Sequence, residues 1–188
     1  LLDALVISTD RKAYPPKRFL TIMLQDKNGF PKSGVIEWKV PKEVAAIDVG
    51  DVRPDKGREL VFITERGVSY SSVTNGRVGS MKDLLSVLSV VAIPYERGVP
   101  YYNFVRDYTG DGKDDILVVG FSEALLAIQK GDHQWIEEKL RLRPSMNIQA
   151  WDIGRLLGDS EHPMYRVSYY VPQIYSADTN ADGLPDLV

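Results

Sequence analysis

The stretch Asp107-Tyr-Thr-Gly-Asp-Gly-Lys-Asp-Asp115 runs directly into the apolar segment Ile116-Leu-Val-Val-Gly120. Side-chain oxygens fall at positions 1, 3, 5 and 9 of this stretch, and a glycine stands at position 6. A calcium ion takes about six to eight oxygens, and a short loop supplies them at alternating positions around a sharp glycine turn. The sequence therefore predicts a Ca²⁺ loop, in which the ligands are Asp107, Thr109, Asp111, the carbonyl of Lys113, and Asp115.

The same pattern recurs near the end of the sequence, as Asp178-Thr-Asn-Ala-Asp-Gly-Leu-Pro-Asp186 followed by Leu187 and Val188. The internal spacing of the two copies is identical, and chance rarely repeats so many constrained positions. A second Ca²⁺ loop is therefore expected, with ligands at Asp178, Asn180, Asp182, the carbonyl of Leu184, and Asp186.

The residues after the loop distinguish between calcium-binding families. An EF-hand needs an acidic residue at position 12 and then a helix. Position 12 is Val118 here, inside a short apolar run rich in branched residues, which is typical of a buried strand. With a loop that precedes a strand, the segment resembles the FG-GAP/VCBS repeats of integrin-α-type β-propellers, which have an Asp-x-Asx-x-Asp-Gly-x-x-Asp loop before a blade strand. This resemblance implies a fold and a metal and leaves the ligand unnamed.

A decayed copy of the motif begins at residue 51. Asp51, Asp55 and Glu59 keep the acidic spacing, whereas Arg53 stands at position 3 and Lys56 replaces the glycine at position 6. A guanidinium group cannot ligate calcium and would repel it. The sequence therefore predicts a loop of the same shape with little or no metal, held by an internal salt bridge from Arg53 or Lys56 to the acids.

The decayed copy reveals an internal repeat with an offset of 107 − 51 = 56 residues. Self-similarity at a period of roughly 50 residues, with several short strands per unit, is typical of β-propellers. We expect an all-β fold of propeller-type blades made of short antiparallel strands. Its approximate units are 1–50, 51–106, 107–177 and the start of a further unit at 178–188. These are about three blade equivalents, whereas a propeller has about four to eight blades. Either more chain belongs to the propeller or the blades form an open arc, and we expect a fragment of a longer chain.

Further strands are expected at 2–7, 19–24, 35–40, 99–105, 165–170 and 173–177. Residues 81–91 fit either a helix or a strand, and the repeat favours a strand. Residues 155–163 fit either a third, degenerate loop or an insertion, because the preceding Ala150-Trp-Asp-Ile-Gly154 echoes Ala46-Ile-Asp-Val-Gly50.

Composition excludes several classes of protein. The chain has 188 residues, of which 44% are hydrophobic, so it permits a sizeable core. It has 23 basic and 26 acidic residues, a net charge of −3 and a pI near 5.5, which argue against nucleic-acid binding. It has no cysteine, and no apolar run reaches the ~20 residues that a membrane span needs.

Signals for catalysis are weak. His133 and His162 are too few for a multi-histidine zinc site, and Glu137 and Glu138 are adjacent, so on a strand they would face opposite sides. The tyrosines could stack on sugars, although packing between blades is the favoured interpretation. The segment Lys130-Gly-Asp132 resembles an adhesion tripeptide but occupies a turn position of the repeat.

These observations together favour a calcium-binding, non-enzymatic binding or adhesion module outside the cytoplasm, because weak loops fill at the millimolar calcium levels found there. The expected partner is a protein or a carbohydrate. The alternatives are the propeller domain of a polysaccharide lyase or hydrolase, since related propellers include sugar-cleaving enzymes, and a purely structural repeat domain beside a catalytic domain.

Overall fold

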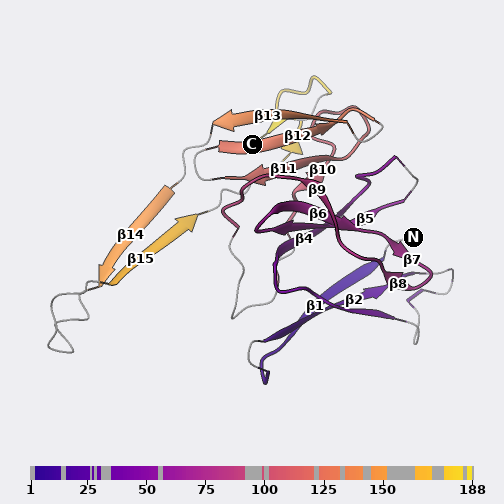
Figure 1. The fold of residues 1–188 in the computed structure, drawn as a ribbon. Helices are drawn as coiled ribbons and strands as arrows, with labels where there is room; N and C mark the ends of the chain where they lie inside the picture. Colours follow the sequence, from indigo (N-terminus) through magenta and orange to yellow (C-terminus); the bar gives the residue numbers. More distant parts are fainter. Residues whose placement is uncertain are drawn as a thin grey trace, which may run out of the picture.

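The structure, a computed structural model, describes residues 3–13, 16–25, 27, 29–30, 35–54, 57–91, 99, 102–120, 123–131, 134–141, 145–151, 164–170, 176–183 and 186–187. Across these residues the fold is all-β and the sheets are antiparallel, which confirms the predicted class (Figure 1). Among the described strands, none of the antiparallel sheets closes on itself. The described part of the chain contains no helix of the length and apolarity needed to cross a membrane.

Two four-stranded antiparallel sheets form the centre of the molecule, and both have their strands in chain order. The first sheet consists of β4 (Val44–Gly50), β5 (Glu59–Thr64), β6 (Gly67–Ser71) and β9 (Lys82–Leu85). The second sheet consists of β10 (Val105–Arg106), β11 (Asp115–Val119), β12 (Glu123–Gln129) and β13 (Trp135–Arg141). The strands of the two sheets correspond one to one, as the repeat predicts.

The remaining sheets are smaller. The N-terminal sheet consists of β1 (Ala4–Asp10), β2 (Lys17–Met23) and β3 (Ile36–Lys39), as expected from three of the sequence segments. Three hairpins complete the fold: β7 (Val73–Thr74) with β8 (Arg77–Val78), β14 (Ser145–Trp151) with β15 (Met164–Tyr170), and β16 (Ser176–Ala177) with β17 (Asp186–Leu187).

Two open questions from the sequence have different outcomes. Within 81–91 the chain forms strand β9 and no helix, so the strand interpretation is confirmed. The stretch 155–163 lies outside the described residues, as do 173–175 of the last expected strand. Of that strand the described part is β16.

The burial of strand β5 explains why its central residues 60–63 are all apolar instead of alternating with polar ones. All of its residues are buried, because both faces of the first four-stranded sheet are covered. Leu60 and Phe62 pack toward the N-terminal sheet, in a cluster with Leu20 and Ile22 of β2. Successive side chains of a strand point to opposite faces. The side chains between them, including Val61, accordingly join the cluster shared with the second four-stranded sheet.

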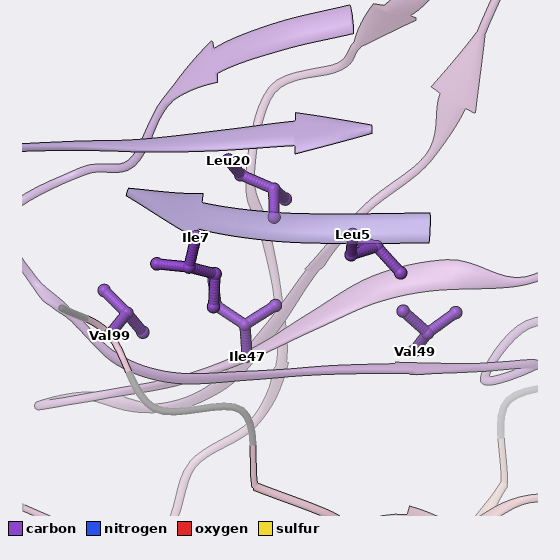
Figure 2. A pocket seen from close by; sticks show the side chains of 6 residues that line it. All are labelled: Leu5, Ile7, Leu20, Ile47, Val49 and Val99. Carbon is purple, nitrogen blue, oxygen red and sulfur yellow. The ribbon is translucent and has the colours of Figure 1, made fainter. Parts of the chain in front are cut away.

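A cavity of about 380 Å³ lies between the N-terminal sheet and β4. In Figure 2, Leu5 and Ile7 of β1 face Val49 and Ile47 of β4 across it, with Val99 at one side. The described lining residues are all aliphatic, so their side chains provide dispersion contacts and no polar atom that could orient a ligand.

The two four-stranded sheets are joined by a buried carboxylate as well as by apolar packing. Asp48 of β4 is only 2% exposed, and its Oδ2 accepts hydrogen bonds from the backbone N–H groups of Phe104 (2.7 Å) and Val105 (2.8 Å). Beside it, a Cβ added to Gly50 would lie 2.1 Å from Cγ1 of Val105. The sheets therefore approach so closely at this point that only glycine fits.

Candidate metal loops

Three hairpin loops have the same register. In each, eight residues (51–58, 107–114 and 178–185) connect two neighbouring strands of one sheet, and the position-9 acid pairs with the residue that precedes position 1. The pairs are Gly50 with Glu59, Arg106 with Asp115, and Ala177 with Asp186. The three loops recognised in the sequence are therefore closed in the same way.

The position-9 acid has the same backbone partner in all three loops. Its carboxylate accepts a hydrogen bond from the N–H of position 2, which closes the loop from inside. The donor–acceptor distances are 3.3 Å for Val52 to Glu59, 3.0 Å for Tyr108 to Asp115, and 2.9 Å for Thr179 to Asp186. This contact shows that the described ends of the decayed loop close in the same way as those of the other two, whereas the shape of the loop at residues 55 and 56 lies outside the described residues.

The position-1 acids bind the turn of their own loops. Asp107 accepts the N–H groups of three consecutive residues, Gly110 (2.7 Å), Asp111 (3.1 Å) and Gly112 (2.8 Å). Asp178 accepts the equivalent N–H groups of positions 5 and 6 at 3.2 and 3.0 Å. The position-6 glycine has φ +85° in both loops, a left-handed conformation that glycine adopts without steric cost. The predicted sharp turn is thus present in each.

The pKa values of the position-9 aspartates in the two intact loops shift in opposite directions, because the two side chains differ in burial. Asp115 is 0% exposed, and burial raises its pKa, while N–H donors that include those of Gln129 (3.0 Å) and Tyr108 act in the opposite direction. Asp186 is more accessible, and the hydroxyl and backbone N–H of Thr179 lower its pKa. The first loop is therefore anchored into the core, whereas the second depends on local contacts.

The position-3 and position-5 residues of the two intact loops differ in burial, since Asp111, Asn180 and Asp182 are exposed but Oγ1 of Thr109 is buried. Asp111 accepts the backbone N–H of Lys113 (3.0 Å), and its other carboxylate oxygen lies 3.8 Å from Nζ of Lys130. In the last loop, Asn180 and Asp182 bind each other through Nδ2 to Oδ2 at 3.0 Å. Thr109 uses its backbone N–H to bind Asp115 (3.1 Å). Leu184 lies outside the described residues.

The donor chemistry of the loops suits calcium, which prefers carboxylate, amide and carbonyl oxygens. The predicted ligands of each loop lie within one eight-residue turn and its closing acid. Over the part of the chain that is described, however, no three Asp, Glu, His or Cys side chains gather as a metal-holding group. The carboxylates are bound instead to backbone N–H groups and, for Asp111, lie near the Lys130 ammonium.

The decayed loop has an arginine, Arg53, at position 3, where the other two loops have Thr109 and Asn180. Nη1 of Arg53 donates to Oγ of Ser72 (3.0 Å), and its guanidinium lies 5.5 Å from the centre of the Tyr70 ring. Asp55 and Lys56 lie outside the described residues. The expected salt bridge to the acids stays a prediction.

Two acids that belong to no motif recognised in the sequence join the two four-stranded sheets. Asp114 precedes the position-9 ligand and belongs to no ligand pattern, yet its Oδ2 accepts the backbone N–H of Asp51 (2.8 Å) across the two sheets. Asp48 joins the same sheets from the strand before the decayed loop. The available signal for Asp48 was a lone acid within an apolar strand.

Comparison with known proteins adds little to this description. No protein-family model and no curated protein matches the sequence. One solved structure, of an Agrocybe aegerita lectin described as recognising non-reducing terminal N-acetylglucosamine, aligns with 98% of this chain at 14% identity and a TM-score of 0.39. This chain spans about half (51%) of that lectin chain. Similarity at this level does not support an argument about fold or ligand.

Proposed function

We propose that this chain is a calcium-stabilised, non-enzymatic binding or adhesion module, built from propeller-type blades of the FG-GAP/VCBS kind. The single observation that supports the proposal best is the recurrence of one loop geometry. In three loops the position-9 acid accepts the N–H of position 2. Such recurrence across separated segments is expected of blades that share one structural role for the loop.

Calcium has a structural role in this proposal. Each intact loop connects two neighbouring strands of one sheet, and its carboxylates would repel one another around a shared centre unless a cation neutralised them. A ligand that binds only the native state stabilises it, by about 2.7 kcal/mol when its concentration is 100 times the dissociation constant. Calcium would therefore hold the hairpin loops against the sheets.

The proposed location is outside the cytoplasm. Extracellular calcium-binding modules have dissociation constants of about 10⁻⁴–10⁻³ M, whereas cytosolic sites must bind much more tightly. The loops of this chain are largely exposed, since Gly110, Asp111 and Gly112 all reach solvent. An exposed loop of this kind favours weak binding and hence a compartment with millimolar calcium.

A binding role is favoured over catalysis because the acids of the loops already have backbone partners. Glu137 and Glu138 are both exposed on β13 and belong to no cluster of acids and bases among the described residues. The partner is a protein or a carbohydrate on the surface of the blades.

Thermal unfolding with calcium and with EDTA tests the proposal. We expect calcium to raise the unfolding midpoint, and titration calorimetry to show two sites. Asp111→Ala and Asp182→Ala should each remove one site, whereas the charge-matched Glu138→Gln, an exposed residue of β13, should keep both. Equal midpoints in calcium and EDTA, or normal calcium binding by both loop variants, would exclude calcium as the stabilising ligand.

A further inference from the structure

A polar pocket of about 340 Å³ lies beside the first intact loop, between the two four-stranded sheets. The residues that matter for its chemistry are the three acids Asp48, Asp107 and Asp114 and the three donors Arg58, Asn103 and Arg106. The pocket therefore combines both signs of charge, and the question is which of these groups remain available to a ligand.

The three acids are already engaged by the protein. Asp48 accepts the N–H groups of Val49, Phe104 and Val105. Asp107 accepts three N–H groups of its own loop, and Asp114 accepts that of Asp51. Each carboxylate oxygen has two lone-pair positions, so these acids keep some capacity to accept a hydroxyl hydrogen but are no longer bare charges.

The hydrogen-bond donors of the pocket, unlike its acids, are not engaged by described residues of the protein. The guanidinium groups of Arg58 and Arg106 and the side-chain amide of Asn103 have no hydrogen-bond or ion-pair partner among the described contacts. All three residues are exposed at the surface of the pocket. A guanidinium offers a planar fork of donors that matches the geometry of a carboxylate. The groups of the pocket that remain available are therefore donors, which suit an oxyanion.

We propose that this pocket binds a small polyhydroxylated acid, with the chemistry of a uronic acid residue. The arginines bind the carboxylate of the ligand, and the remaining lone pairs of the engaged acids accept its hydroxyl hydrogens. The volume is at the lower end of the range of about 300–1,000 Å³ for ligand pockets, which suits a single sugar ring. The inference rests on the proposed role as a binding module, although it does not require calcium to be bound.

Calcium would strengthen the interaction. Asp107 lines the pocket and is also the position-1 residue of the loop, so a cation bound there would add positive charge beside the oxyanion. We expect the uronic acid to bind more tightly in calcium than in EDTA, and the affinity to fall as salt screens the charges.

The experiment compares methyl β-D-glucuronide with methyl β-D-glucoside, which has the same ring without the carboxylate. Titration calorimetry should give a dissociation constant of about 1 mM for the glucuronide and at least about tenfold weaker binding for the glucoside. Arg58→Gln and Arg106→Gln should each weaken glucuronide binding about tenfold, since each removes a charge-assisted hydrogen bond. Arg77→Gln, on β8 and outside the pocket lining, is the matched control and should bind normally.

The inference is overturned if the glucoside binds as well as the glucuronide, if the Arg58→Gln/Arg106→Gln double variant binds like the parent, or if the glucuronide does not bind. Unfolding midpoints of the variants, which change only exposed residues, verify that they are folded. Glucuronide binding in EDTA by a protein that shows no calcium effect would retain this inference and refute the calcium proposal. Calcium binding without glucuronide binding would do the reverse.

Discussion

Replacement of Asp48 by alanine should be among the most destabilising single changes in this chain. The side chain is 2% exposed and accepts backbone N–H groups of Phe104 at 2.7 Å and Val105 at 2.8 Å. Both donors belong to buried residues, Val105 at the start of β10 and Phe104 directly before it, so alanine leaves them without this acceptor. An unsatisfied buried donor costs about 1–3 kcal/mol, and two of them suggest a loss of about 4 kcal/mol.

A loss of this size is a large fraction of the stability of a typical domain, which is about 5–15 kcal/mol. Because so large a loss could leave the alanine variant unfolded, Asp48→Asn is the second, milder variant. Its amide oxygen still accepts the two inter-sheet N–H groups, but its NH₂ group replaces the oxygen that accepts from Val49 (2.8 Å). We expect the asparagine variant to lose about 1–2 kcal/mol, in proportion to one lost hydrogen bond to a charged group.

Urea unfolding followed by tryptophan fluorescence measures both losses. Glu137→Ala is the control, because Glu137 is exposed on β13 and its side chain makes no hydrogen bond or ion pair among the described contacts; it should change stability by at most about 0.5 kcal/mol. If Asp48→Ala unfolds within about 1 kcal/mol of the parent, the carboxylate does not hold the two sheets together and the reasoning is wrong.

Three further predictions concern the sheet contact and the loops. Gly50→Ala places a Cβ 2.1 Å from Cγ1 of Val105 and should cost about 1–3 kcal/mol in urea unfolding; Val105→Ala in the same chain should restore part of the loss, and purely additive losses would contradict the contact. Lys130→Gln removes an ammonium group 3.8 Å from a loop carboxylate and should tighten calcium binding about two- to fivefold at low salt; unchanged affinity in calorimetry would contradict the assignment. Thr179→Val removes a donor that lowers the pKa of Asp186, so carbon NMR titration should show that pKa rise. Because a lowered pKa gives stability that is present above the ordinary aspartate value and is lost as pH falls through the lowered value, the variant should be less stable than the parent at neutral pH, and the difference should shrink as pH falls through that lowered value; a difference that does not change with pH would refute this.

The loops and their flanking strands could be predicted from the sequence because the interactions that form them are local. A glycine at position 6 is needed wherever φ is +85°, and Gly112 and Gly183 both have this conformation. The position-9 acid reaches the N–H of position 2 within the same nine residues, whether the acid is Asp115 or the longer Glu59. Spacing along the chain therefore determines each loop almost completely, and the recurrence of the spacing revealed the repeat.

Contacts between the sheets could not be predicted in the same way. Asp48 and Phe104 are 56 residues apart, and Asp51 and Asp114 are 63 apart. These groups meet only because the two sheets pack face to face through a shared apolar core, and nothing in the local sequence specifies which residues of two stacked sheets come into register. The pocket with Arg58 and Arg106 arises from the same stacking.

The amino-acid pattern alone was sufficient for the all-β class, the repeat and the shape of the hairpin loops, because these follow from alternation, glycine geometry and hydrogen bonds over a few residues. Which carboxylates join the sheets, and which donors stay free beside them, depended on tertiary packing. The physical reason is distance along the chain: a buried N–H takes whichever acceptor the packed core places next to it, however far away that acceptor lies in the sequence.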